Sequence, residues 1–137
     1  MPTVIRGSDN IDTSNVATQT ELNAKVQTAI VTVNGGANIS VNSRYVEVNP
    51  FGNANYEKCS VRAEVYINGR WSEAGFVYST NGFGTSGHSN LEGIVVQTGG
   101  SAVATSGTSG GGGLGEVANT TSAPCRVIVT YVETTNA

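Results

Sequence analysis

The residues that could carry catalysis are few and lie far apart along the chain. His88 is the only histidine, and the two aspartates, Asp9 and Asp12, lie near the start. A serine–histidine–aspartate triad needs its three groups in one hydrogen-bonded line, and this spacing gives no support for one. No group of histidine, cysteine and aspartate has the spacing of a metal site. We therefore expect a protein that is not an enzyme and that needs no cofactor and no metal.

A glycine-rich stretch is the nearest thing to a ligand-binding motif. Residues 110–115, "GGGGLG", fit the G-x-G-x-x-G spacing of a dinucleotide-binding loop. Such a loop needs a helix after it, but "EVANTTSAP" follows without a helical pattern. We expect a flexible surface loop instead. Three roles stay open for it: close approach between subunits, contact between a glycan and backbone N–H groups, and simple connection.

The composition narrows the class of protein. Only 12% of the 137 residues are charged, about half the usual share of a soluble domain. The net charge is -3, and lysine and arginine do not cluster, so we expect no nucleic-acid partner. No run of about 18 apolar residues exists, so we expect no membrane insertion. The start, "MPTVIRGSDN", lacks the apolar region of a secretory signal, and we expect none.

The two cysteines, Cys59 and Cys125, are too few for a scaffold built on disulfides. Two free, buried thiols are the simpler interpretation. Both cysteines lie on runs in which apolar residues alternate, so a bridge across one core stays open.

The first quarter of the chain is predicted to contain an arm and a short helix. Residues 1–17 show no sustained periodicity, so we expect an extended arm that stays loose or lies on another protein. Over residues 18–33 we expect a helix, because Thr18 and Glu21 fit a capping box and apolar residues follow the spacing of a coiled-coil seam. The partner of this seam is either the chain's own β-domain or sister copies, and we favour sister copies. The seam consists of Leu22, Val26, Ala29 and Val33.

From residue 34 to residue 137 the sequence predicts a β-rich domain. The strand "CSVRAEVYI" alternates apolar and polar residues, and Asn68-Gly69 after it is a strong hairpin signal. We predict a hairpin over residues 61–78 that pairs Tyr66 with Trp71 and Val61 with Phe76. "LEGIVVQT" and "CRVIVTYVE" are predicted strands, and residues 79–90 are predicted to form a loop. The fold class is mainly β, an antiparallel sandwich or barrel-like domain preceded by the arm and one short helix.

Tyr66 and Trp71 form a candidate aromatic platform on the outer face of this hairpin. Such a platform can bind sugars by stacking on their apolar faces. Ordinary packing or a contact between subunits is the alternative interpretation.

Two parts of the sequence resemble bacteriophage tail-fibre proteins. "TVIRGSDNIDTSNVATQTEL" is similar to the N-terminal arm of such fibres. "VNPFGN", "AEVYINGRW", "LEGIVVQTG" and "APCRVIV" are similar to a small β-domain of phage fibre and tail-associated proteins. The resemblance implies a structural protein of the virion, made in the host cytoplasm and assembled as a homotrimer. Full tail fibres are usually much longer, so a stubby fibre, a fibre tip and a head fibre all stay open.

The resemblance also implies roles for particular segments. The arm would attach to other virion proteins in the tail, baseplate or capsid, and the helix seam would hold the trimer together. Loops 79–90 and 99–119 would contact a host surface glycan or protein. The alternatives are a capsid decoration protein without a receptor and a small carbohydrate-binding module. The residues concerned are Val4, Ile5, Ile11 and Val16 in the arm and Phe83, His88, Gly111, Gly112 and Leu114 in the loops.

Overall fold

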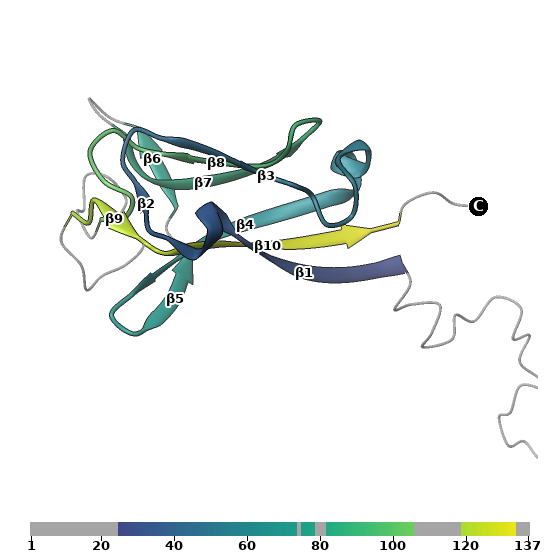
Figure 1. Cartoon of the computed structure of the whole chain (residues 1–137), viewed down its shortest axis with the longest axis horizontal. Coiled ribbons are helices and arrows are strands. Elements are labelled where there is room, and N and C mark those ends of the chain that lie inside the picture. The colour runs from purple at the N-terminus through teal and green to yellow at the C-terminus, as the bar shows by residue number, and fades with distance from the viewer. Residues whose placement is uncertain (1–24, 74, 79–81, 106–118, 134–137) are drawn as a thin grey trace, which may run out of the picture.

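The computed structural model of the chain describes residues 25–73, 75–78, 82–105 and 119–133. Over these ranges strands and turns dominate, so the predicted mainly β fold class is confirmed. Two four-stranded antiparallel sheets lie one above the other (Figure 1). Neither sheet closes into a barrel within the described ranges. The architecture is therefore sandwich-like.

The first sheet contains both ends of the described chain. Its strand order is β1-β10-β4-β5, and all its neighbours are antiparallel. β1 and β10 pair along their whole length, with Val26 opposite Val132 at one end and Thr32 opposite Arg126 at the other. The strands are β1 (Val26–Thr32), β10 (Cys125–Val132), β4 (Cys59–Ile67) and β5 (Arg70–Glu73).

The second sheet covers one face of the first. Its strand order is β3-β8-β7-β6, and a short two-stranded ladder, β2 with β9, lies beside it. β7 packs on β4, where Gly87 and Ala63 come so close that a Cβ on Gly87 would lie 3.4 Å from that of Ala63. The strands are β2 (Ile39–Ser40), β3 (Arg44–Glu47), β6 (Phe76–Tyr78), β7 (Gly82–Asn90), β8 (Gly93–Thr98) and β9 (Ser122–Ala123).

The core lies between the two sheets and consists mostly of β-branched side chains. Alternate residues of β10 point into it, as the sequence predicts, and the continuous apolar run of β8 is buried as expected. β-branched side chains pack well on a pleated surface. The largest fully buried apolar side chains are Ile39, Ile94, Val33, Val65, Val96, Val103, Val127 and Val129.

The helix prediction is wrong over Val26–Thr32, which form strand β1. Most of these residues are β-branched, and such side chains lose rotamer freedom in a helix. The helical spacing of the seam was misleading, because a strand places Val26 on the outer face and Val33 in the core. The structure therefore assigns residues 26–33 to the β-domain. Leu22 and the rest of the expected helix before Lys25 lie outside the described residues.

The predicted hairpin is confirmed for β4 and β5 and wrong beyond them. Tyr66 lies opposite Trp71, and both turn residues, Asn68 and Gly69, have positive φ angles of 55° and 77°. After β5 the chain turns at Gly75, where φ is +62°. β6 then pairs with β7 in the second sheet, so Phe76 lies opposite Gly84 and not opposite Val61.

The predicted loop over residues 79–90 is wrong from Gly82 onward, because Gly82–Asn90 form strand β7. The next segment, Gly99–Thr105, also packs into the domain, and Ala102, Val103 and Ala104 are fully buried. Gly99 approaches the second sheet so closely that a Cβ there would lie 2.2 Å from the backbone oxygen of Gly82. Some of the chain's glycines therefore serve close backbone packing and not flexibility.

The two cysteines are free thiols. In the β4–β10 register Cys59 lies opposite Tyr131 and Cys125 lies opposite Val65, at opposite ends of the ladder. A strand rises about 3.3 Å per residue, so the separation is far too long for a disulfide. Both thiols are therefore free, as the simpler interpretation expects, but only Cys125 is buried and Cys59 is half-buried.

Candidate binding site

The first sheet has one side that is turned away from the second sheet, and we call this side the outer face. Because side chains alternate along a strand, every second residue of β1, β10 and β4 points outward. The antiparallel register places these residues in rows across the sheet. From one end to the other the rows contain Val26 and Val132; Thr28, Thr130 and Ser60; Ile30, Ile128 and Arg62; and Thr32, Arg126, Glu64 and Glu73.

Glu64 is a buried carboxylate on this outward-facing surface, with 6% of its area exposed. Arg126 donates from Nε to Oε1 of Glu64 at 2.8 Å, and Nη2 of Arg62 lies 2.9 Å from Oε2. Both carboxylate oxygens are thus paired with guanidinium groups. A buried carboxylate is costly without such partners, so the network fixes Glu64 and both arginines together.

Arg126 also packs on an aromatic ring. Its guanidinium carbon lies 4.4 Å from the centre of the Trp71 ring, a cation–π contact. Trp71 in turn contacts Tyr66, with ring centroids 5.2 Å apart and planes tilted by 56°. The two residues of the predicted platform are therefore neighbours, but Arg126 covers one face of Trp71. Tyr66 and Trp71 therefore do not form a flat, open stacking surface.

A groove of about 270 Å³ lies beside this cluster, between β1 and the β4–β5 hairpin. Apolar side chains make up much of its wall, and Arg126 is the only charged residue among the described residues that line it. We call it the Arg126 groove. It is lined by Ile30, Thr32, Gly36, Trp71, Pro124, Cys125 and Arg126.

Cys125 does not bring nucleophilic chemistry to this groove. It is buried, and burial raises the pKa of its thiol to about 12. Because the thiolate is the reactive form of cysteine, the side chain stays an unreactive thiol at neutral pH. The groove thus combines a fixed cation with apolar surface. That combination can recognise an anion that also carries an apolar face.

The opposite end of the first sheet contains a second polar cluster. Glu133 accepts a hydrogen bond from Lys58 at 2.8 Å and another from the hydroxyl group of Tyr131 at 2.7 Å. These hydrogen bonds to Glu133 are the main cause that raises the pKa of Lys58 and that of Tyr131. The backbone N–H of Glu133 also donates to the carbonyl oxygen of Lys25 at 2.7 Å. The cluster fastens β1, β4 and β10 together where the described chain begins and ends.

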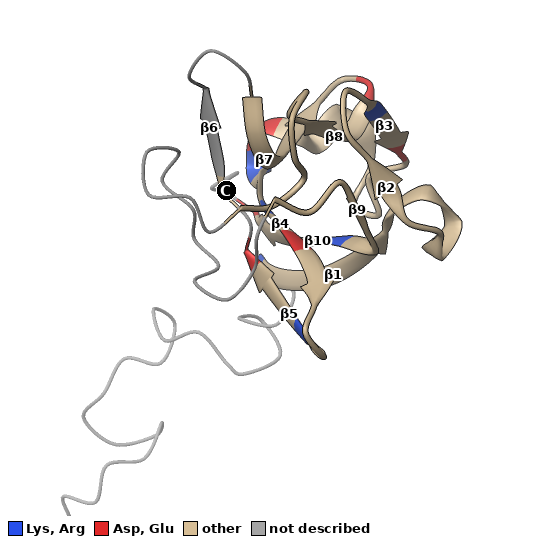
Figure 2. Cartoon of the chain, turned by 90° about the vertical axis from the view of Figure 1, so that its left-hand side faces the viewer, with Lys and Arg blue, Asp and Glu red and all other residues tan. Residues whose placement is uncertain are grey.

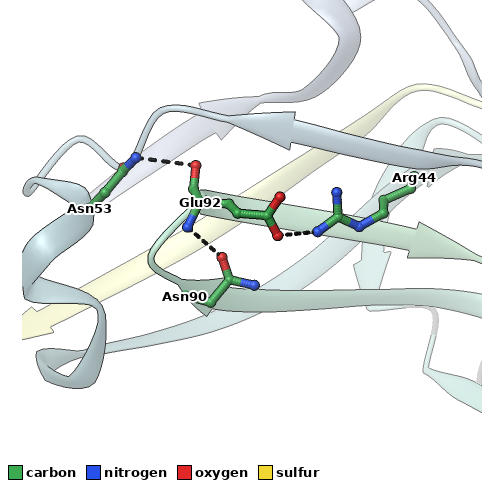
Figure 3. A network of polar contacts seen from close by, with 4 residues as sticks. All are labelled: Arg44, Asn53, Asn90 and Glu92. Atoms are coloured by element: carbon green, nitrogen blue, oxygen red, sulfur yellow. Dashed lines mark hydrogen bonds and ion pairs between the residues drawn. The ribbon is translucent and has the colours of Figure 1, made fainter.

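A third polar cluster supports the turn between β7 and β8 (Figure 3). Arg44 forms an ion pair with Glu92, and the backbone N–H of Glu92 donates to Asn90 at 2.8 Å. Asn53 donates to the carbonyl oxygen of Glu92 at 3.1 Å. Each group contacts another group of the same turn region, so the cluster stabilises the turn.

The structure separates the remaining residues that the sequence singled out. Phe83 and His88 lie on β7, and His88 is exposed with Ser86 at 3.2 Å from its ring nitrogen Nε2. Val26 is exposed on the outer face, whereas Ala29 and Val33 point toward the core. Outside the described residues lie Val4, Ile5, Ile11, Val16, Leu22, Gly111, Gly112 and Leu114.

Sequence reasoning missed Arg126 and Ile30, which line the groove with Trp71. Arg126 lies in the last strand, 55 or more positions from Trp71 and Glu64, and only the β10–β4 register brings them together. The alternation in "CRVIVTYVE" does place Arg126 and Ile128 on one face. That signal predicts an outward position but not the neighbours.

No protein-family model, curated protein or solved structure matches this chain. Among the described residues, no helix is long and apolar enough to cross a membrane. The same residues contain no group of three histidine, cysteine, aspartate or glutamate side chains that could hold a metal ion. The site must be interpreted from its own geometry.

Proposed function

We propose that the chain is a structural protein of a bacteriophage particle, a trimeric fibre or fibre tip. It would attach to the particle by its N-terminal arm and contact the host surface with its β-domain. The observation that carries the proposal is the open apolar part of the outer face. Val26, Ile30 and Val132 are 51%, 59% and 40% exposed there. An exposed apolar patch on a small domain marks an interaction surface.

The edge of the first sheet supports self-association. Within the described ranges β1 pairs only with β10, so β1 is an edge strand. Between Val26 and Thr32 it contains neither proline nor a charged residue. Natural proteins normally protect such an edge, because it readily pairs with another chain. Residues 1–24 lead directly into this edge, so the predicted attachment arm and the proposed assembly surface are contiguous.

Low charge supports a role that depends on contact and not on catalysis. Figure 2 shows that charged residues are sparse over the described ribbon. The ion pairs Lys58–Glu133, Arg44–Glu92 and Arg126–Glu64 link neighbouring strands and turns. The trimeric state and the virion setting rest on the resemblance of the arm and of the β-domain to phage fibres.

The test is the mass of the purified full chain in solution, measured by light scattering. We expect the natural sequence to have the mass of three chains. Val26→Lys and Val132→Lys place a charge on the assembly surface and should each release single chains. The matched control is Val46→Lys, because Val46 is 45% exposed on the edge strand of the other sheet.

A single chain for the natural sequence would contradict the proposal. So would a three-chain mass that survives both substitutions on the outer face. If the chain is instead a decoration protein, we expect the same assembly. In that case no substitution in the β-domain should affect adsorption of the phage particle to host cells.

A further inference from the structure

We infer that the Arg126 groove is a binding site for a carboxylate-bearing saccharide, held by the guanidinium group of Arg126. The inference deepens the proposed function, on which its setting at a host surface rests, by naming the class of ligand. It depends on four observations: the unused donors of Arg126, its fixed orientation, the local charge, and the shape of the wall.

Arg126 has N–H donors that make no hydrogen bond within the described part of the chain. Its Nε–H bonds to Glu64 at 2.8 Å, and no side chain or backbone acceptor in the described part of the chain pairs with either Nη atom. The guanidinium group of arginine carries five N–H donors in a planar fork. Its outer edge therefore has the geometry for two parallel hydrogen bonds to one carboxylate.

The arginine is already fixed before any ligand arrives. Glu64 holds its Nε, and its guanidinium carbon lies over the ring of Trp71. A side chain that is immobilised in the free protein loses less conformational entropy on binding. A carboxylate that docks at Arg126 therefore meets an orientated fork and not a mobile surface arginine.

The charge around the groove favours an anion. Glu64 is shared between Arg126 and Arg62, so two guanidinium groups face one carboxylate. Glu73 lies opposite Glu64 in the β4–β5 ladder, but it is exposed and lines a different depression with Gly75 and Ser86. Among the described residues that line the Arg126 groove, none is acidic.

The rest of the wall suits a sugar ring. Ile30, Trp71 and Pro124 offer apolar surface, and the hydroxyl group of Thr32 offers a hydrogen bond. The volume of about 270 Å³ lies just below the range of roughly 300–1,000 Å³ typical for drug-sized ligands. A single acidic sugar ring fits this space. An extended acidic peptide would instead need contacts along a longer groove.

The experiment uses the indole N–H signal of Trp71, which is unambiguous because the chain has one tryptophan. Glucuronate is titrated into the full chain, with glucose as the matched neutral sugar. We expect the signal to shift and saturate with a Kd of about 1 mM for glucuronate, and glucose to bind at least tenfold more weakly. Equal shifts with both sugars, or none with glucuronate, would overturn the inference.

Two variants locate the site. Arg126→Gln should abolish the preference for glucuronate over glucose. Because that change also affects Glu64, Ile30→Asp provides a second test: it adds a like charge at an exposed position of the groove wall and should weaken glucuronate binding tenfold or more. Val46→Asp, on the other sheet, is the control and should leave binding unchanged. Full binding by both groove variants would contradict the inference.

A capped acidic peptide separates the sources of a carboxylate. We expect it to shift the Trp71 signal more weakly than glucuronate, and stronger binding by the peptide would contradict the saccharide assignment. Light scattering of the same sample separates this inference from the proposed function. Three chains without glucuronate binding would refute only the inference, and single chains that bind glucuronate would refute only the fibre assembly.

Discussion

The two ends of the outer face use the same strands for different purposes. At one end Val26 and Val132 lie opposite each other and are half exposed, next to the point where residues 1–24 enter. At the other end Thr32, Arg126 and Glu64 lie in one row across the sheet. Arg126 and Glu64 belong to the charged network, and Thr32 and Arg126 line the groove. Figure 1 shows that β1 and β10 run the whole way between them. We propose an assembly end and a ligand end on one surface.

A few outward-pointing side chains decide whether an end of this face suits assembly or ligand binding. Both ends are built on the same β1–β10 pairing, and both place one outward side chain per strand in each row. Where those side chains are valines, the face offers apolar area that gains from burial, roughly 25 cal/mol per Å². Where an arginine is held by Glu64 and Trp71, the face offers directional hydrogen bonds.

The largest expected effect on stability comes from the charged network. Glu64→Ala removes the acceptor that both arginines share and leaves Arg126 without its anchor. We expect unfolding in urea to become easier by about 1–3 kcal/mol, because hydrogen bonds to charged groups typically contribute that much to stability. Glu73→Ala, on the exposed residue opposite, is the control and should cost no more than about 0.5 kcal/mol. Equal losses from the two changes would contradict the stabilising role given to the Glu64 network.

High pH should loosen the assembly end and spare the ligand end. The pKa values of Lys58 and Tyr131 are both raised in the folded chain, chiefly by their hydrogen bonds to Glu133. Their contribution is fully present below the unfolded pKa values near 10 and is lost as pH rises through the higher folded values. Arginine stays charged throughout this range.

The measurement is the free energy of unfolding across alkaline pH for the natural chain and for Glu133→Gln. We expect the advantage of the natural chain to shrink as pH rises above about 10. The thiol of Cys125 also titrates there, with a folded pKa of about 12, but it does so in both chains and cancels in the difference. An advantage that stays constant with pH would contradict the role given to Glu133.

The smallest effect on stability is expected from replacing residues 106–118 with a shorter glycine–serine linker. Hydrogen bonds already hold the residues on either side of this segment together. The backbone N–H of Val103 donates to the carbonyl oxygen of Thr120 at 2.7 Å, and the hydroxyl group of Thr105 donates to the side-chain oxygen of Asn119 at 2.5 Å. Halving a flexible loop changes its closure cost by only about 0.6 kcal/mol. We expect the unfolding free energy to change by less than about 1 kcal/mol.

The same replacement tests the predicted host contact of this segment. Particles that carry it should adsorb less well to host cells, while glucuronate binding at Trp71 stays unchanged. Unchanged adsorption would remove residues 106–118 from the contact surface and leave the Arg126 groove as the candidate.

Local signals in the sequence were enough for part of the fold. Asn68-Gly69 predicted its hairpin and the pairing of Tyr66 with Trp71, because the turn type alone fixes that register. The buried run of β8 was equally clear. The error at Val26–Thr32 arose because spacings of three and four also occur in a strand, and β-branched content was the signal that should have decided.

The groove could not be predicted, because it depends on pairings between residues far apart in the sequence. β10 must lie between β1 and β4 before Arg126 can reach Glu64 and Ile30 can face Trp71. The turn at Gly75 likewise sends β6 to the other sheet and ends the hairpin early. Neither event has a local cause strong enough to recognise in the sequence.

Hydrogen exchange of the β1 amides tests the central claim most directly. In the full natural chain we predict that the amides of Val26–Thr32 that point away from β10 are protected as well as those of β10, and that Val26→Lys lowers their protection while β4 and β8 keep theirs. Such a result would show that another chain covers this edge. Equal protection of β1 in the natural and Val26→Lys chains would contradict the assembly end.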